Sequence, residues 1–323
     1  MKARALQALL AELEHLRQSR VILYIGQDRG RFPHQIIEED MPPLFACLRQ
    51  KERVDRLDLL LHLAGGSIPC AHGLCHLLHT YGKHVSMLVP YKARSAGTLL
   101  CLGAHEIVMG PFAQLGPIDP LMAQQASSAS GNPPVIAAED IRAFPHMAKS
   151  WFGIQENEQK LHLLQRLCER IFPTSLTAFF RAAQQIKATT EQHLRLHLPE
   201  ASPEQRQKIA EYLIQECYSH DHIITRDDAR EIGLTVAFPS QQEESLLWRI
   251  WETCSQDVLS PPHLWMQADQ AQQISAVIAS TDFLARCLVN VTRSQEESEA
   301  EGVQRSTHLL IEKQWEIIDA ADA

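Results

Sequence analysis

The sequence lacks the features that would place it in a membrane or on nucleic acid. None of its apolar runs approaches the ~20 residues that a membrane-spanning helix needs. It has no cluster of lysine and arginine, and its 323 residues carry a formal net charge of −9 at pH 7. Nucleic acid and anionic membrane surfaces are therefore poor candidates for partners, and we expect no membrane span.

Motifs for nucleotides and metals are also missing. The chain has no G-x-x-x-x-G-K-[ST] phosphate loop, no H-E-x-x-H and no pair of C-x-x-C motifs. Cysteines and histidines do gather at 70–79, but on one predicted helix, where packing explains them better than zinc does. Because the eight cysteines are scattered and residues 1–20 do not resemble a secretory signal, we expect free thiols in a cytoplasmic protein without metal or cofactor.

What the chain does contain is a regular succession of apolar runs and helical patterns. Hydrophobic residues make up 45% of the sequence, enough for a substantial core. Short apolar runs at 21–25, 57–63, 84–90 and 106–109 read as buried strands, with helical segments between them. This alternation predicts an α/β fold.

The pattern also suggests a division of the chain. Leucines at helical spacing predict a helix over 1–20, and the core is expected over 21–239, with a helical insertion at about 139–218. From 240 to 323 the pattern predicts a helical extension that serves in oligomerisation or partner docking. Three tryptophans of this part, Trp248, Trp251 and Trp265, belong either to the core or to an assembly surface.

The most informative segment is YKARSAGT at 91–98, between the strand 84–90 and a helix of small residues at 96–104. A serine on such a turn, Ser95, has its hydroxyl at a helix N-terminus, where free N–H groups stabilise a developing oxyanion. Gly65 and Gly66 directly follow another buried strand and offer a second set of amides. Helix capping is the simpler role for Ser95, but together these are the parts of an acyl-transfer site.

Three stretches together resemble the Clp-protease/crotonase superfamily, and most closely the serine dehydrogenase proteinase family, soluble relatives of signal peptide peptidase A. They are LDLLLHLAGGS at 57–67, the long motif at 89–120 and SHDHIITRDDAREIGLTV at 219–236. The resemblance implies a Clp/crotonase-type core of repeated ββα units. It also implies that Ser95 is the nucleophile and that Gly66 and Ala96 supply the N–H groups of an oxyanion hole.

The general base is where the sequence departs from the Clp pattern. A serine needs an adjacent base, yet the stretch 116–120, where Clp proteases have histidine, contains none. Asp221 falls where the Clp triad has its aspartate. Signal peptide peptidases use a lysine instead, which makes Lys149 the first candidate by chain order, His220 its rival and His146 a more distant third.

The resemblance implies a serine peptidase with a catalytic dyad that acts on peptide or protein substrates. Since no nucleotide motif is present, activity would be independent of ATP, and any unfolding of substrates would come from another protein. The superfamily commonly forms rings or trimers, so we expect a homo-oligomer, with a regulatory partner bound through the C-terminal part. Two alternatives stay open: an inactive scaffold with this fold, and a crotonase-type acyl-CoA enzyme.

Overall fold

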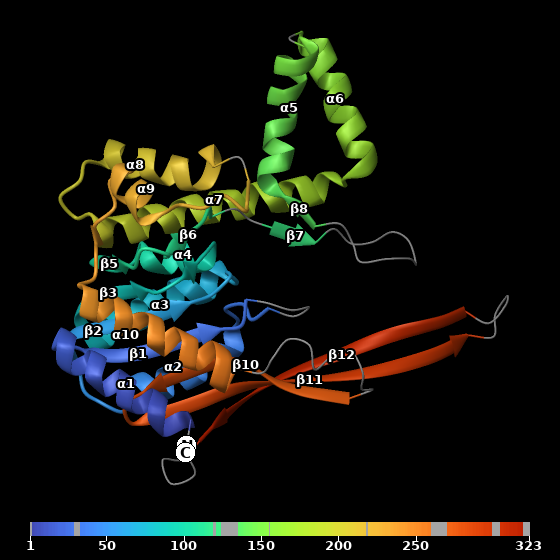
Figure 1. The fold of residues 1–323 in the computed structure, drawn as a ribbon. Helices are drawn as coiled ribbons and strands as arrows, with labels where there is room; N and C mark the ends of the chain where they lie inside the picture. The colour runs from blue at the N-terminus through green and yellow to red at the C-terminus, as the bar shows by residue number, and fades with distance from the viewer. Residues whose placement is uncertain are drawn as a thin grey trace.

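The computed structural model describes residues 2–28, 33–118, 121–123, 135–154, 156–217, 219–259, 270–298 and 304–318. Its centre is a sheet of eight strands in the order β12-β11-β10-β1-β2-β3-β5-β9 (Figure 1). The strands are β1 (Arg20–Gly26), β2 (Val54–His62), β3 (Gly82–Val89), β5 (Glu106–Met109), β9 (Val236–Ala237), β10 (Gln270–Ser280), β11 (Phe283–Ser298) and β12 (Gln304–Ile317).

The half of the sheet from β1 to β9 is parallel. Leu23 pairs with Leu60, which in turn pairs with Leu88, so three neighbouring strands place leucines side by side. Every residue of β1 is buried, as expected where helices cover both faces of a parallel sheet. The predicted α/β class is confirmed.

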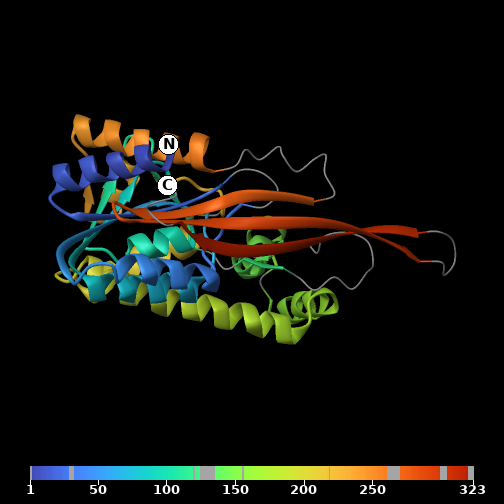
Figure 2. The same ribbon diagram turned by 90° about the horizontal axis from the view of Figure 1, so that it is seen from below.

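Helices cover this sheet on both sides (Figure 2). On one face, α2 (Met41–Leu48), α3 (Ile68–Tyr81) and α4 (Ala96–Cys101) enclose a core that includes Leu59 and Leu61. On the other face, α1 (Lys2–Arg17) and α10 (Gln241–Thr253) pack over Leu60 and Leu88. The side-chain alternation along each strand thus divides the interior into two hydrophobic clusters.

The C-terminal part differs from the predicted helical extension. It is helical through α10 and a π-helical turn at Cys254–Val258, but from Gln270 onward it forms β10, β11 and β12. β10 runs antiparallel to β1, with Leu23 opposite Ala279. Because residues 275–280 are buried on both faces, they lack the polar and apolar alternation that marks a half-exposed strand, and the prediction of helix was wrong there.

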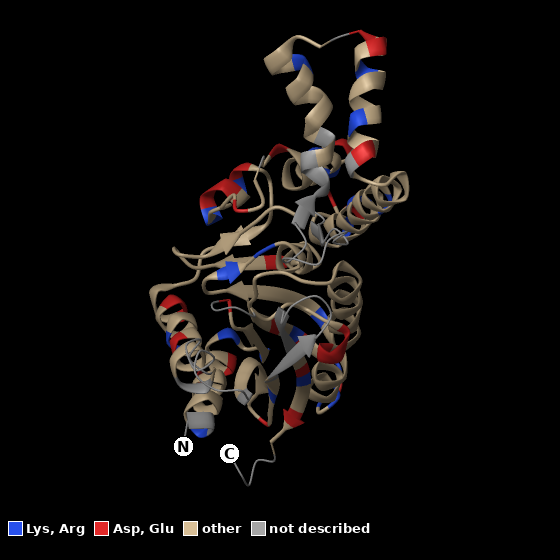
Figure 3. Ribbon diagram, turned by 90° about the vertical axis from the view of Figure 1, so that its right-hand side faces the viewer, with Lys and Arg blue, Asp and Glu red and all other residues tan. Residues whose placement is uncertain are grey.

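Helices fill the stretch at which an insertion is expected, and two of them stand out from the body (Figures 1 and 3). Prolines occupy the first turn of the third and fourth helices, where a missing N–H costs nothing. None of the described helices is long and apolar enough to cross a membrane. The helices are α5 (Ala138–Phe152), α6 (Asn157–Arg170), α7 (Pro173–His197) and α8 (Pro203–Glu211), the last continued by a π-helical turn at Tyr212–Glu216.

Shorter elements connect these layers. A 3-10 helix (Glu38–Asp40) leads into α2, and α9 (Arg226–Glu231) precedes β9. Two small sheets accompany the large one: β4 (Lys92–Ala93) pairs with β6 (Gln114–Leu115), and β7 (Leu121–Ala123) pairs with β8 (Val135–Ala137).

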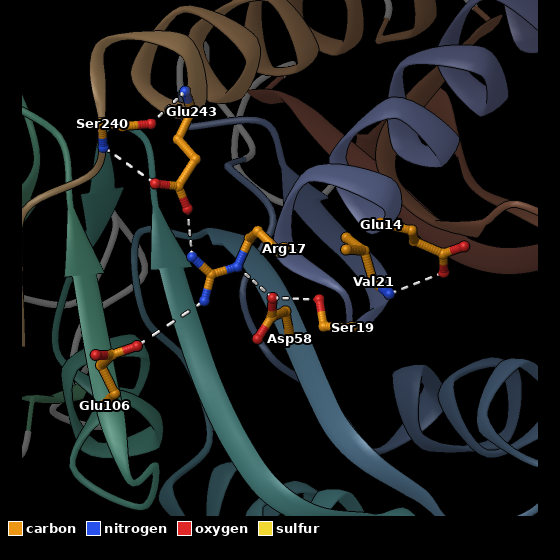
Figure 4. A network of polar contacts seen from close by, with 8 residues as sticks. All are labelled: Glu14, Arg17, Ser19, Val21, Asp58, Glu106, Ser240 and Glu243. Carbon is orange, nitrogen blue, oxygen red and sulfur yellow. Dashed lines mark hydrogen bonds and ion pairs between the residues drawn. The ribbon is translucent and has the colours of Figure 1, made fainter.

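One buried arginine joins four elements on the α1/α10 face (Figure 4). The Arg17 guanidinium, at the end of α1, donates to Asp58 of β2 and, at 2.5 Å, to Glu243 of α10. A third nitrogen lies 3.9 Å from Glu106 of β5. Ser19 adds a hydrogen bond of 2.6 Å to Asp58, whose side chain is fully buried. The arginine therefore neutralises a carboxylate that has no access to water.

Replacing this arginine should destabilise the fold strongly. We expect Arg17→Met to lower the free energy of unfolding by about 3 kcal/mol, because Asp58 would be left as a buried charge without its partner. Urea denaturation measures the loss. Arg166→Met is the control, since Arg166 forms an exposed pair with Glu169 and its loss should cost less than ~0.5 kcal/mol. Equal losses for the two variants would contradict this account.

Candidate active site

The turn that carries Ser95 has an unusual backbone. Ser95 precedes α4 with φ 52° and ψ −116°, a combination that side chains normally avoid. Such a conformation costs about 1–3 kcal/mol and persists only where the surrounding structure enforces it. The Ser95 side chain makes no helix-capping hydrogen bond, and the residue is partly exposed.

Thr98 holds this turn against the segment that follows β5. Its buried hydroxyl accepts a hydrogen bond of 3.0 Å from the Gly116 N–H and lies 2.7 Å from the Ala93 carbonyl oxygen, to which it donates. The β4–β6 ladder, with Ala93 opposite Leu115, adds backbone support beside it. The residues on both sides of Ser95 are thereby fixed to residues about 20 positions further along the chain.

The predicted diglycine turn lies directly against Ser95. Gly65 and Gly66 both have φ of +140°, and a Cβ on Gly65 would lie 3.0 Å from the Cβ of Ser95 and 3.4 Å from its Oγ. A Cβ on Gly66 would lie only 2.3 Å from the backbone nitrogen of Ile36. The Ile36 N–H donates to the Gly65 carbonyl at 2.9 Å, so that carbonyl is bound away from the serine. Both positions therefore require glycine, because a side chain has no room there and because the backbone conformation is one that glycine alone adopts readily.

Two backbone amides at this contact have no acceptor among the residues that the structure describes. Within the described part of the chain, the N–H groups of Gly66 and Ala96 take part in no hydrogen bond, although the amides of Ser67 and Gly97 beside them do. Unpaired amides beside a partly exposed hydroxyl are able to bind an oxygen atom that carries negative charge.

The segment against Gly66 is itself anchored by a buried carboxylate. Asp40 accepts hydrogen bonds from the Tyr24 hydroxyl, from the Ile37 N–H at 3.0 Å and from the Trp315 indole at 2.9 Å. His34 lies 3.2 Å from the same carboxylate. Burial and the Asp40 charge raise the pKa of Tyr24 well above its usual value, so its hydroxyl remains a donor. Trp315 of β12 thus supports a segment that contacts the diglycine turn.

His220 and Asp221 lie next to the serine turn. Leu115 and Ile224 form an antiparallel bridge, in which the N–H of each donates to the carbonyl of the other, and this bridge brings the segment alongside β6. Arg94, the residue before Ser95, has a guanidinium nitrogen 3.9 Å from the Asp221 carboxylate. The Nδ1 atom of His220 is buried and has no hydrogen-bond partner among the described residues. Burial lowers the pKa of His220, with Asp221 acting against this and Arg94 adding to it, which favours the neutral imidazole.

Lys149 and His146 lie elsewhere in the fold. Lys149 is in the last turn of α5 and its side chain is exposed. His146 lies 3.4 Å from Ser150 of the same helix. Figures 1 and 3 show α5 and α6 projecting from the body, and no interaction joins either residue to Ser95 among the described residues. The role of Lys149 as a base stays a prediction.

A polar group that was not predicted from the sequence lies at the same edge of the sheet. Lys92 donates to Asp28 at 2.6 Å, and His62, at the end of β2, lies 3.7 Å from the same carboxylate. The Lys92 backbone N–H donates to His62 Nδ1 at 3.2 Å. Burial acts to raise the pKa of Asp28, but the bonds to His62 and Lys92 outweigh it and hold this pKa well below its usual range. The sequence signal for this group was His62, a polar residue near the end of an apolar run that precedes Gly65.

Histidines hold the other end of α4. His193 Nδ1 donates to the Leu99 carbonyl at 2.7 Å, and His197 Nδ1 donates to the Ala104 carbonyl at 2.6 Å. His79 Nε2 lies 2.7 Å from the Gly103 carbonyl. No group of three potential metal ligands is present among the described residues. Burial lowers the pKa of His193 to about 4 and that of His197 to about 4. His193 and His197 therefore serve as neutral donors in the packing around α4.

Comparison with known proteins finds a family model that matches the N-terminal part of this chain. Residues 1–132 match the model of the ClpP-like SDH-type serine proteinases. The predicted resemblance is confirmed. The matched region contains β1, β2, β3 and β5, the diglycine turn and Ser95, and at the level of the family it supports a serine peptidase.

Individual relatives add little about activity. MJ0137 of Methanocaldococcus jannaschii, an uncharacterized protein, is 24% identical over 250 residues, which cover 76% of this chain and 77% of the relative. MJ1495 of the same organism, also uncharacterized, is 23% identical over 70% of each chain. A mutant of the 1510-N membrane-bound stomatin-specific protease has a similar solved structure, with 17% identity, a TM-score of 0.38 and coverage of 70% of this chain and 83% of that one.

A side chain on Gly65 should disturb the site more than the fold. We expect Gly65→Ala to abolish reaction of Ser95 with an activated phosphonate, because the new methyl group would press on Ser95 at 3.0 Å. Gly97→Ala is the matched control, since its Cβ would meet Ala93 at an ordinary 3.6 Å. Mass spectrometry of the labelled protein gives the readout, and circular dichroism checks the fold. Retained labelling in folded Gly65→Ala would contradict the contact.

The buried histidines should make the fold sensitive to acid. Since the pKa values of His193 and His197 are about 4 in the folded chain and about 6.5 when unfolded, the unfolded state binds more protons between these values. Stability should fall as the pH is lowered from 6.5 to 4, by roughly 3 kcal/mol for each group. Urea unfolding at pH 7.5, 6 and 5 measures this. His193→Gln should reduce the pH dependence, whereas His162→Gln on α6 should leave it unchanged.

Proposed function

We propose that this protein is a serine peptidase that cleaves peptide bonds through an acyl-enzyme on Ser95. The observation that carries the proposal is the contact between the strained Ser95 turn and the diglycine turn, with two unpaired amides beside it. Ser95 Oγ attacks the substrate carbonyl carbon, and the N–H groups of Gly66 and Ala96 donate to the oxyanion that forms. Donors already in place for that charge are a large source of rate enhancement in acyl transfer.

His220 is the base that the contacts favour. Its imidazole lies in the segment beside Arg94, its Nδ1 is unpaired, and its lowered pKa keeps it neutral at pH 7. A neutral imidazole takes the proton from Ser95 and returns it to the leaving amine. Asp221, exposed and facing Arg94, orients this segment. Lys149 is the alternative base, and it requires the α5–α6 pair to approach Ser95 from the same chain or from a second copy.

The wider setting belongs to the same proposal. The peptidase would act in the cytoplasm as a homo-oligomer on peptide or protein substrates, without ATP, metal or cofactor. The inactive scaffold and the acyl-CoA enzyme are its competitors; covalent capture of Ser95 distinguishes the peptidase from both, and consumption of a thioester distinguishes the two from each other. A scaffold has no activated serine, and an acyl-CoA enzyme consumes a thioester without a Ser95 adduct.

A fluorophosphonate probe tests the nucleophile. We expect one adduct, on Ser95, in the wild-type protein and none in Ser95→Ala, because only an activated hydroxyl attacks the phosphorus atom at neutral pH. Ser95→Gly is a second null variant that accepts the positive φ without strain. Tryptic mass spectrometry locates the adduct. A folded wild-type protein that forms none would reject the proposal.

The same probe separates the two bases. We expect His220→Ala to lower the labelling rate at least 100-fold, while His222→Ala, a histidine two positions on, has little effect. Lys149→Ala and its control Lys160→Ala, both on the projecting helices, should label at the wild-type rate. If His220 is the base, the labelling rate should decrease toward acidic pH with a midpoint below pH ~6.5, because burial lowers the pKa of this histidine. Loss of labelling in Lys149→Ala alone would assign the base to the lysine.

A further inference from the structure

A cavity of about 420 Å³ opens at the carboxyl edge of the parallel sheet, between strand ends and α10. Pro90 follows β3 and Gly110 follows β5, so the cavity begins where these two paired strands stop. In α/β proteins, ligands bind at this edge of the sheet. Its size suits a long side chain together with its backbone. The apolar lining consists of Pro90, Gly110, Pro111, Phe112, Leu247 and Trp248.

Aromatic rings form much of one wall. Phe112 stacks on Tyr91 with ring centroids 5.0 Å apart, and Trp248 lies edge-on to Phe112 at 6.0 Å. Phe112 is nevertheless 57% exposed, although it is a large apolar side chain. Trp251 supports Trp248 from behind at 4.6 Å. The rings are thus held in place by one another, and part of their surface is open to a ligand.

Among the described residues that line the cavity, one has a carboxylate, Glu244 in the first turn of α10. Its neighbour Glu243 is bound to Arg17 and to Ser240, whereas the Glu244 side chain has no hydrogen bond or ion pair among the described residues. An apolar, aromatic cavity with a single unpaired negative charge is complementary to a side chain that has an apolar stem and a cationic head.

We propose that this cavity is a substrate subsite for an arginine side chain. A guanidinium stacks flat on aromatic rings and forms two parallel hydrogen bonds with a carboxylate, which a lysine ammonium does not. Arginine stacks on an aromatic ring elsewhere in this chain, where Arg230 lies 3.5 Å and Arg226 4.3 Å from the ring centre of Phe238. The inference rests on the proposed function, since it assigns the peptide class that the Ser95 site would cleave.

The cavity lies within reach of a peptide bound at Ser95. Pro90 precedes Ser95 by five residues, so the two are at most ~18 Å apart along an extended chain. The Tyr91 carbonyl accepts a hydrogen bond of 2.6 Å from Gln114, which ties the cavity wall to the ladder beside the serine. An extended substrate therefore has its arginine within about five residues of the bond that is cut.

Binding to the Ser95→Ala protein tests this subsite without relying on cleavage. Eight-residue peptides, each with one arginine at a different position, are compared by calorimetry with peptides that carry citrulline, its neutral isostere. We expect one arginine position to bind about tenfold more tightly than citrulline, as a charge-assisted hydrogen bond would give. Glu244→Gln should remove the difference, and Glu252→Gln, on the same helix, should retain it.

The outcomes separate this inference from the proposed function. Equal affinity for arginine and citrulline peptides would overturn the subsite, as would a preference that persists in Glu244→Gln or a lysine peptide that binds as well as arginine. Fluorophosphonate labelling of the wild-type protein is independent of these results. A preference for arginine in a protein that forms no Ser95 adduct would uphold the subsite and reject the peptidase. A Ser95 adduct in a protein without a preference for arginine would reject the subsite alone.

Discussion

The close approach of Gly65 to Ser95 is the constraint on which the rest of the site depends. Only a residue without a side chain leaves room for the serine, and the side chain of Ser95 lies against the glycine turn on a strained backbone. That strain is maintained by the bonds of Thr98 and by the β4–β6 ladder on one side, and by the segment of Ile36 on the other. The large sheet serves chiefly to bring these separate supports to one edge.

Much of this site was predictable because its parts are local in sequence. Ser95 lies on a strand-to-helix turn, and Gly65 and Gly66 end an apolar run, so each part can be recognised from a few neighbouring residues. The candidate base is different, because the segment of His220 is brought alongside β6 by a backbone pairing between Leu115 and Ile224, more than 100 positions apart. Sequence spacing carries no information on such a contact, and chain order pointed first to Lys149, which the fold places on an exposed helix.

The same distinction applies to the fold. The parallel strands were predictable because each is a short apolar run bounded by turns. The strand β10 was not, because burial of residues 275–280 on both faces removes the alternation that identifies a strand, and its pairing partner β1 lies about 250 residues earlier. The polar group of Asp28, His62 and Lys92 was missed for a related reason: each residue is unremarkable alone, and only the sheet brings the three together.

The hydrogen bond from Trp315 to Asp40 has a consequence for how the protein matures. Asp40 fixes the segment that presses on Gly66, yet one of its donors lies 275 positions later in the chain. A chain emerging from the ribosome with its N-terminus first has Ser95 and both glycines long before it has this tryptophan. The nascent polypeptide therefore lacks part of the scaffold around its diglycine turn until Trp315 has been synthesised.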